Sequence, residues 1–219
     1  MKYSDKSNHY FNGSRPEMLK FFPKEFKTYL DIGCGRGGMI ALVKESNTVE
    51  AWGIEYVEDQ AKSAEEVADR VYSGAIEDNL DKLPDGYFDV ISCLDVLEHL
   101  TYPEEVLRKI RSKLSPEGVI ISSIPNVRHF SNMYNLLVRH DWKYEVTGIL
   151  DYTHLRFFTS KSILRMYNNA GYEIIMNEGI NPAKWWKYLI VNIFTLGMFN
   201  DGKYIQYATV AKAASQAKL

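Results

Sequence analysis

The sequence is poor in cysteine and has no excess of positive charge. Its only two cysteines, Cys34 and Cys93, match neither a disulfide framework nor a metal-binding spacing. We therefore expect two small buried thiols in a reducing compartment, the cytoplasm. The 26 basic and 28 acidic residues give a net charge of −2, whereas nucleic-acid-binding domains are usually basic. The composition favours a small-molecule partner and no nucleic acid.

Long apolar runs are also lacking. The first twelve residues are polar with scattered aromatics and lack the apolar core of a secretory signal. The most apolar stretch, Trp185 to Phe199, is shorter than the roughly 20 residues that a membrane-spanning helix needs. We expect 182–200 to be an apolar helical segment that packs on the domain or caps a pocket. Contact with a membrane surface or a lipid-linked substrate is the alternative.

With neither an internal repeat nor a low-complexity linker, residues 1–219 are predicted to form a single domain. Strand patterns alternate with helix patterns along it. The expected strands are 29–32, 49–55, 71–76, 88–93, 119–124, 172–177 and 204–211. The expected helices are 39–44, 59–70, 103–114, 133–138 and 160–170, the last capped by Thr159. This alternation predicts an α/β fold, with a mostly parallel sheet and helices on both faces.

Two stretches break the alternation. Residues 1–26 precede the first strand and are predicted to be an N-terminal lid. Residues 125–158 are aromatic, polar and partly helical, and so many functional groups are unusual in a mere connector. We predict that this insertion lies on the substrate side of the sheet, beyond the carboxyl ends of the strands.

The stretch from Leu30 to Gly38 places four glycines directly after an apolar run and Asp31. Glycines in such a turn let the backbone approach a ligand closely, and the following helix offers free N–H groups. The pattern fits a nicotinamide dinucleotide or S-adenosylmethionine, and Glu55 suits the ribose diol of either. Asp31 favours S-adenosylmethionine, which carries an ammonium and a sulfonium but no phosphate.

The sequence resembles the class I S-adenosylmethionine-dependent methyltransferases (type 11/12-like) over about residues 8 to 212. The matching stretches, in order, are 30–37, 53–55, 74–77, 88–100 and 114–118. The resemblance implies a Rossmann-like sheet of seven strands with the last antiparallel. It also implies a set of cofactor-binding residues: Asp31, Gly33, Gly35, Glu55, Tyr56, Ala75, Ile76, Glu77, Leu94 and Asp95.

Within that set, the resemblance assigns the first three residues to the methionine end of the cofactor, and Glu55 to the ribose. The next four surround the adenine, and Leu94 and Asp95 lie under the sulfonium. Many relatives have an aspartate where this chain has Ala75. Residues 10–17 and 151–159 also resemble bacterial methyltransferases encoded near sugar and cell-surface-polysaccharide genes, which implies a glycan-linked acceptor.

Methyl transfer to a hydroxyl needs alignment of the reactants and a base. His154 is our first candidate for the base, with Asp151 to orient it, and His99 is the second. Arginine forks suit anionic substrate groups and aromatic rings suit a pocket wall. The candidate substrate-binding residues are Tyr10, Arg15, Arg128, His129, Trp142 and Arg156. Each of these residues has a plain structural role as its alternative, and no metal site is predicted.

We therefore predict an S-adenosylmethionine-dependent methyltransferase that O-methylates a small molecule or a sugar- or glycan-linked hydroxyl and releases S-adenosylhomocysteine. Two alternatives remain at this point: an NAD-dependent oxidoreductase that uses the same glycines, and a non-catalytic cofactor-binding module.

Overall fold

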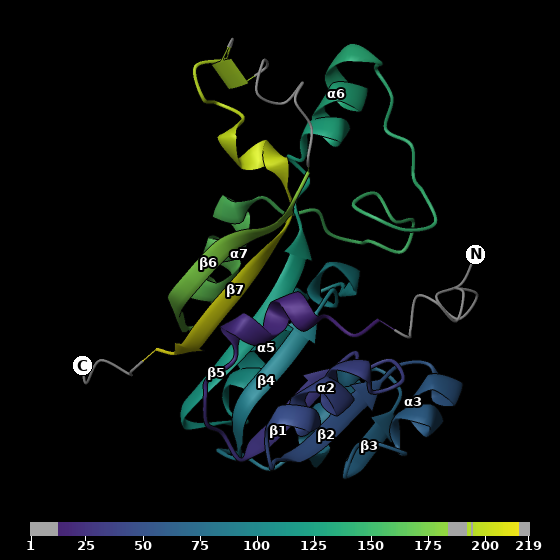
Figure 1. Cartoon of the computed structure of the whole chain (residues 1–219), viewed down its shortest axis with the longest axis vertical. Helices are drawn as coiled ribbons and strands as arrows, with labels where there is room; N and C mark the ends of the chain where they lie inside the picture. The colour runs from purple at the N-terminus through teal and green to yellow at the C-terminus, as the bar shows by residue number, and fades with distance from the viewer. Residues whose placement is uncertain (1–12, 184–191, 194, 215–219) are drawn as a thin grey trace.

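A seven-stranded sheet forms the centre of the molecule (Figure 1). The computed structural model describes residues 13–183, 192–193 and 195–214. The strand order is β3-β2-β1-β4-β5-β7-β6. The strands are β1 (Thr28–Ile32), β2 (Glu50–Glu55), β3 (Arg70–Ser73), β4 (Phe88–Leu94), β5 (Leu114–Pro125), β6 (Tyr172–Pro182) and β7 (Tyr204–Ala213). Strands β1 to β5 run parallel, and β7 is antiparallel to both neighbours, which confirms the predicted fold class.

Helices cover both faces of the sheet, each over its own apolar layer. One layer contains residues of α2 (Gly38–Ser46), α3 (Glu58–Ala64) and the 3-10 helix η2 (Pro16–Phe21). The other contains residues of α4 (Ile76–Asn79), α5 (Pro103–Arg111) and α7 (Ser160–Asn169). Successive side chains of β1 point to opposite faces of the sheet, so the strand contributes to both layers. Leu30 and Ile32 pack in the layer with α5, and Tyr29 packs in the layer with α2. The short 3-10 helices η3 (Leu80–Lys82), η4 (Leu97–His99) and η5 (Asn200–Lys203) connect the elements.

The site is positioned by the switch in strand order at β1. The chain leaves β1 toward β2 and β3, then returns to the other side of β1 as β4. Connections therefore diverge where β1 and β4 end, and a crevice opens at that point in sheets of this type. The parallel register places Asp31 opposite Ser92 across these two strands.

The predicted boundary between the helix at 59–70 and the strand at 71–76 is wrong. Helix α3 ends at Ala64, six residues before the predicted end at residue 70, and β3 begins at Arg70. The reason is Asp69, whose carboxylate accepts a hydrogen bond from the Ala51 N–H at 2.7 Å and pairs with Lys44 Nζ at 2.7 Å. These bonds hold the chain against β2, and they outweigh the helical pattern.

The segments outside the regular units meet at the carboxyl ends of the strands. Residues 13–26 of the expected lid are packed on the sheet through the buried Met18 and Phe21. The insertion 125–158 contains α6 (Phe130–Val138), which stands beyond the tips of β4 and β5 (Figure 1). Of the expected apolar segment, residues 184–191 and 194 lie outside the described residues. In the described part of the chain, no helix combines the length and apolarity needed to cross a membrane.

Candidate active site

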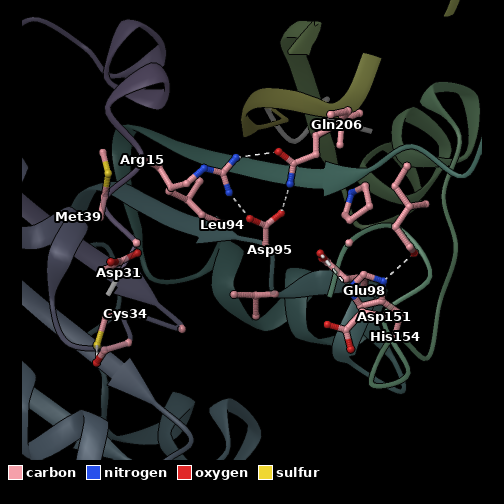
Figure 2. A pocket seen from close by; sticks show the side chains of 18 of the residues that line it. Arg15, Asp31, Cys34, Met39, Leu94, Asp95, Glu98, Asp151, His154 and Gln206 are labelled. Atoms are coloured by element: carbon pink, nitrogen blue, oxygen red, sulfur yellow. Dashed lines mark hydrogen bonds and ion pairs between the residues drawn. The ribbon is translucent and has the colours of Figure 1, made fainter. Parts of the chain in front are cut away.

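Two adjoining cavities lie beyond the ends of β1, β2 and β4. The first, of about 260 Å³, is lined by acidic and polar groups, and Figure 2 shows its side chains. The second, of about 350 Å³, is more apolar and contains Tyr56, Ala75, Ile76 and Glu77 in its lining. Gly33, Glu55, Asp95 and Val96 line both cavities, so the two form one continuous cleft.

The glycine-rich turn forms the floor between the two cavities. Gly33 has φ +74°, and a Cβ atom there would lie 2.5 Å from Cγ2 of Val96, so both backbone and space require glycine. The Glu55 carboxylate accepts hydrogen bonds from the N–H groups of Gly35 at 2.9 Å and Val57 at 2.8 Å. Burial raises the pKa of Glu55, and these hydrogen bonds oppose the rise. The acid thus fixes the turn and still presents lone pairs to the cleft.

Asp31 is the most deeply placed acid of the first cavity. It is 3% exposed and accepts a hydrogen bond from the Ser92 hydroxyl. The Tyr29 hydroxyl lies 2.8 Å from Ser92 Oγ, so three side chains form a buried chain. Desolvation raises the pKa of Asp31 to about 7, although the hydrogen bonds from Ser92 and Tyr29 oppose the rise. Sequence reasoning found Asp31 but missed Ser92 and Tyr29, which only the register of β1 and β4 reveals.

Asp95 follows β4 in a left-handed conformation with φ +56° and joins three distant segments. Its carboxylate forms an ion pair with Arg15 and accepts a hydrogen bond from Gln206 (Figure 2). Arg15 Nη2 in turn donates to Gln206 Oε1 at 2.8 Å. Burial raises the pKa of Asp95, and Arg15 partly offsets this. Arg15, predicted to bind substrate, therefore lies in the same network as the cofactor candidate Asp95. Gln206 carried no signal in the sequence.

The His154 imidazole lies in the wall of the same cavity. Its Nδ1 is 3.0 Å from the Ile149 carbonyl oxygen, which can only accept, so Nδ1 carries the proton in the neutral ring. Nε2 then holds a lone pair, and it lies 3.9 Å from Oε1 of the buried Glu98. The His99 ring packs edge-on against His154 with the ring centroids 4.7 Å apart. The site therefore brings together both predicted base candidates and one acid that sequence reasoning did not single out.

Asp151 lines the cavity, and its side chain forms hydrogen bonds with the following turn. Its Oδ1 accepts hydrogen bonds from the Thr153 N–H at 2.9 Å and from the Thr153 hydroxyl at 2.7 Å. The Asp151 carbonyl oxygen accepts the His154 N–H at 3.0 Å. Asp151 thus positions His154 through the backbone, and the carboxylate beside Nε2 belongs to Glu98.

Four other predicted substrate residues line neither cavity: Arg128, His129, Trp142 and Arg156. Arg128 pairs with Asp201 at 2.7 Å, and Arg156 donates to the Thr101 carbonyl oxygen at 2.7 Å. His129 Nδ1 lies 2.8 Å from Ser131 Oγ, and the Trp142 ring packs edge-on against Phe157. The remaining candidate, Tyr10, lies outside the described residues.

One trio among the described residues has the ligand types of a metal site. The ligand atoms of Glu98, His99 and His154 all lie within 4.8 Å of one another. His154 Nε2 and Glu98 Oε1 are 3.9 Å apart, within the roughly 4.2 Å that can separate two ligand atoms of one cation bound at about 2.1 Å. The trio is therefore a set of metal-ligand types that was not predicted from the sequence.

Comparison with known proteins assigns the family. Residues 8–177 match the model of a methyltransferase domain family. A ubiquinone biosynthesis O-methyltransferase of Idiomarina loihiensis is 30% identical over 169 residues, which cover 72% of this chain and 67% of that protein. The corresponding protein of Chromobacterium violaceum is 26% identical over 198 residues, which cover 86% of this chain and 79% of that protein.

Solved structures share the fold. A SAM-dependent methyltransferase from Archaeoglobus fulgidus has a TM-score of 0.70 at 22% identity, with 94% of both chains covered. The [4+2]-cyclase SpnF has a TM-score of 0.61 at 17% identity, with 97% of this chain and 85% of that chain covered. The fold alone therefore does not fix the reaction, and the family assignment rests on the sequence match.

The cleft fits S-adenosylmethionine. Asp31 and Asp95 offer carboxylates to a cationic methionine end, Glu55 offers lone pairs to a ribose, and the second cavity offers apolar walls to an adenine. Gly33 lies so close to the Val96 side chain that there is no room for a Cβ atom, and the backbone of the turn is therefore bare at this point. Together with the family match over residues 8–177, these features show that the chain belongs to the methyltransferase domain family and is an S-adenosylmethionine-dependent methyltransferase.

Proposed function

We propose that this enzyme methylates a hydroxyl group of a small molecule and that His154 is the general base. The relatives named above are O-methyltransferases, which supports the type of acceptor atom. When bound, S-adenosylmethionine supplies an activated methyl group, so the protein has to align the acceptor and remove its proton. Both of these tasks fall to side chains of the cleft.

Two groups of residues would hold the cofactor. Asp31, Leu94 at the end of β4, and Asp95 line the first cavity and would receive the methionine end. Glu55 would receive the ribose, and the apolar walls around Ile76 would receive the adenine, with Glu77 at the rim. The part of the first cavity that faces His154 would then be left for the acceptor.

The single observation that supports the base is the environment of His154. The Ile149 carbonyl fixes the tautomer in which Nε2 carries a lone pair, and this lone pair accepts the proton of the acceptor hydroxyl. The proton then resides on Nε2, where the Glu98 carboxylate 3.9 Å away stabilises the imidazolium that forms. His99 packs against the ring and limits its rotation.

The test compares His154→Gln with His129→Gln, a matched histidine that lines neither cavity. Formation of S-adenosylhomocysteine is measured with a panel of catechols and free sugars as acceptors. We expect His154→Gln to lower kcat by about 10² to 10⁴ and to leave the cofactor Kd within twofold, since a base acts only in the chemical step. His129→Gln should match the wild type. Undiminished turnover by His154→Gln would refute the base.

A second arm of the same assay adds EDTA. Because the proposed mechanism uses His154 as the base and no cation, we expect turnover to persist without divalent cations. Loss of turnover in EDTA that is restored by a divalent cation would assign the trio of Glu98, His99 and His154 to a metal instead. The sugars in the panel test the glycan-type acceptor that the sequence resemblance implied.

A lipid-linked acceptor is the second candidate, and exposed apolar side chains favour it. Leu137 on α6 is 60% exposed, and Leu196 in the neighbouring segment is 94% exposed. Arg128, at the base of α6, ties the two segments together through the Met198 carbonyl and Asp201. Both segments lie at the same end of the molecule, beyond the tip of β5 (Figure 1). An apolar surface at this end suits an acceptor presented by a membrane.

A further inference from the structure

The buried chain of Tyr29, Ser92 and Asp31 is not used by the mechanism above. Tyr29 and Asp31 are two residues apart on β1 and face the same side of the sheet, and Ser92 is the register partner of Asp31 on β4. All three side chains are buried. Since the Ser92 hydroxyl donates its proton to Asp31, the Tyr29 hydroxyl is the donor to Ser92. Both donors therefore stabilise the charged form of one carboxylate.

Among the described residues, the titratable groups that interact with Asp31 are Tyr29 on β1, Glu55 on β2, Cys93 on β4 and Cys34 in the glycine-rich turn. None of these four groups supplies a positive charge. Burial raises the pKa of the tyrosine and of both thiols, so all three stay neutral near pH 7. Glu55 disfavours a second negative charge. Without a cationic ligand, the pKa of Asp31 is about 7, and the carboxyl group is partly protonated under ordinary conditions.

We propose that Ser92 and Tyr29 are positioning residues that set the proton affinity of Asp31, so that the cationic methionine end of the cofactor displaces a proton from Asp31 when it binds. The bound ammonium stabilises the carboxylate, and the proton leaves to solvent. The inference rests on the cofactor assignment of the family. It does not depend on the acceptor or on His154, so the two proposals fail independently.

The first experiment measures binding by calorimetry between pH 5.5 and 7.5, below the range in which the cofactor's own amine titrates. S-adenosylmethionine and S-adenosylhomocysteine both carry the amino-acid end, and 5′-methylthioadenosine lacks it. We expect the affinity of the first two to rise with pH and that of the third to stay constant. In paired buffers of different ionisation enthalpy at pH 6, about one proton should be released with the first two ligands.

The second experiment removes the donors. Ser92→Ala should raise the pKa of Asp31, and a tenfold stronger hold on the proton lowers the S-adenosylmethionine affinity about tenfold at pH 6. Tyr29→Phe keeps the ring contacts with Phe22 and Phe26 and should act in the same direction to a smaller extent. Ser92→Thr retains a hydroxyl and should preserve the wild-type pH profile. Carboxyl ¹³C NMR of the ligand-free proteins reports the pKa of Asp31 directly.

Two binding outcomes and one spectroscopic outcome would overturn the inference. One is an equal loss of affinity for 5′-methylthioadenosine in Ser92→Ala, because that would show a general disturbance of the cleft. The other is an unchanged pH profile for S-adenosylmethionine in a folded Ser92→Ala protein. Unchanged ¹³C titration of Asp31 would have the same consequence. Turnover is not measured in either experiment, so the identity of the acceptor has no influence on the result.

Discussion

Asp31 lies on β1 at a buried position, where desolvation disfavours the negative charge that binding of a cationic ligand needs. Its pKa in the folded protein is raised to about 7 from an ordinary value of 3.8. The folded state therefore binds the proton more tightly than the unfolded state does. This contribution to stability is fully present below about pH 3.8 and is lost as the pH rises through 7. At pH 8 the ligand-free enzyme carries a buried charge on Asp31, which the Ser92 and Tyr29 hydroxyls stabilise in part and a cationic ligand would neutralise.

Asp31→Asn should therefore stabilise the ligand-free protein at high pH. The neutral amide removes the desolvation of the charge, and a tenfold change in proton affinity corresponds to about 1.4 kcal/mol. We expect the thermal midpoint to rise by several degrees at pH 8 and by much less at pH 4.5, while affinity for S-adenosylmethionine falls. Scanning calorimetry at both pH values checks this. A midpoint that falls at pH 8, or equal changes at the two values, would contradict the assignment.

Sequence reasoning at the scale of single residues worked where chemistry follows from residue type and motif. Asp31 and Glu55 were predicted to bind the cofactor, and both line the first cavity. Their partners were not predictable, because hydrogen bonds such as Ser92 to Asp31 depend on which strands are neighbours and in which register. Glu98, whose carboxylate lies 3.9 Å from His154 Nε2, was not singled out for the same reason, and the orienting role of Asp151 stays a prediction.

At the scale of elements, β2 and the glycine-rich turn pack so closely that one glycine of β2 is required. A Cβ atom on Gly53 would lie 2.7 Å from Cys34 Sγ, which real side chains do not tolerate. Gly53 pairs with Asp31 across β1 and β2, so any shift there is transmitted to the turn. The cysteine and the glycine are complementary in volume.

Gly53→Ala should push the turn outward and weaken S-adenosylmethionine binding by tenfold or more. The double variant Gly53→Ala/Cys34→Ala removes the clashing sulfur and should recover most of the affinity. This non-additivity is the signature of two residues that share one space. Calorimetric titration of the single and double variants, with Cys34→Ala as the control, measures it. A double variant as weak as Gly53→Ala alone would show that the strand itself was damaged.

Elements with a local signal were predicted well. Thr159 was expected to cap the helix that begins at Ser160, and its hydroxyl oxygen accepts the Ser162 N–H at 3.2 Å. The strands β1 and β4 are almost entirely buried, and short, nearly continuous apolar runs of this kind are typical of central parallel strands. The end of α3 was missed because Asp69 acts through β2 and α2, which are remote in sequence. Boundaries set by tertiary contacts do not appear in a local pattern.

At the scale of the whole molecule, the fold brings chain segments that are far apart in sequence into contact at the cleft. Arg15, Asp95 and Gln206 come from the region before β1, the end of β4 and strand β7. They join in one network over the cleft. The antiparallel β7, inserted between β5 and β6, carries Gln206 to this place. The same arrangement puts residues 195–203 beside the base of α6, which creates the apolar end of the molecule (Figure 1).

This apolar end should bind membranes. Leu137 and Leu196 are exposed on it, and Arg139 and Lys143 are placed just after α6, so apolar insertion and attraction to anionic headgroups act together. Flotation with vesicles of phosphatidylethanolamine and phosphatidylglycerol measures the binding. We expect the wild type to float with the vesicles and Leu137→Ser/Leu196→Ser to float several-fold less. Ile175→Ser, which changes an exposed apolar residue on β6, is the matched control and should float as the wild type does.

Exposed positions of this kind rarely change folding stability by more than about 0.5 kcal/mol, so a lost fold is not expected to mimic the result. Circular dichroism of each variant verifies this before flotation. A wild type that stays at the bottom of the gradient would remove the support for a lipid-linked acceptor. Equal flotation of all three proteins would place the membrane contact elsewhere on the chain. In both cases the cofactor cleft and its buried acids keep their assignment, because none of these side chains lines it.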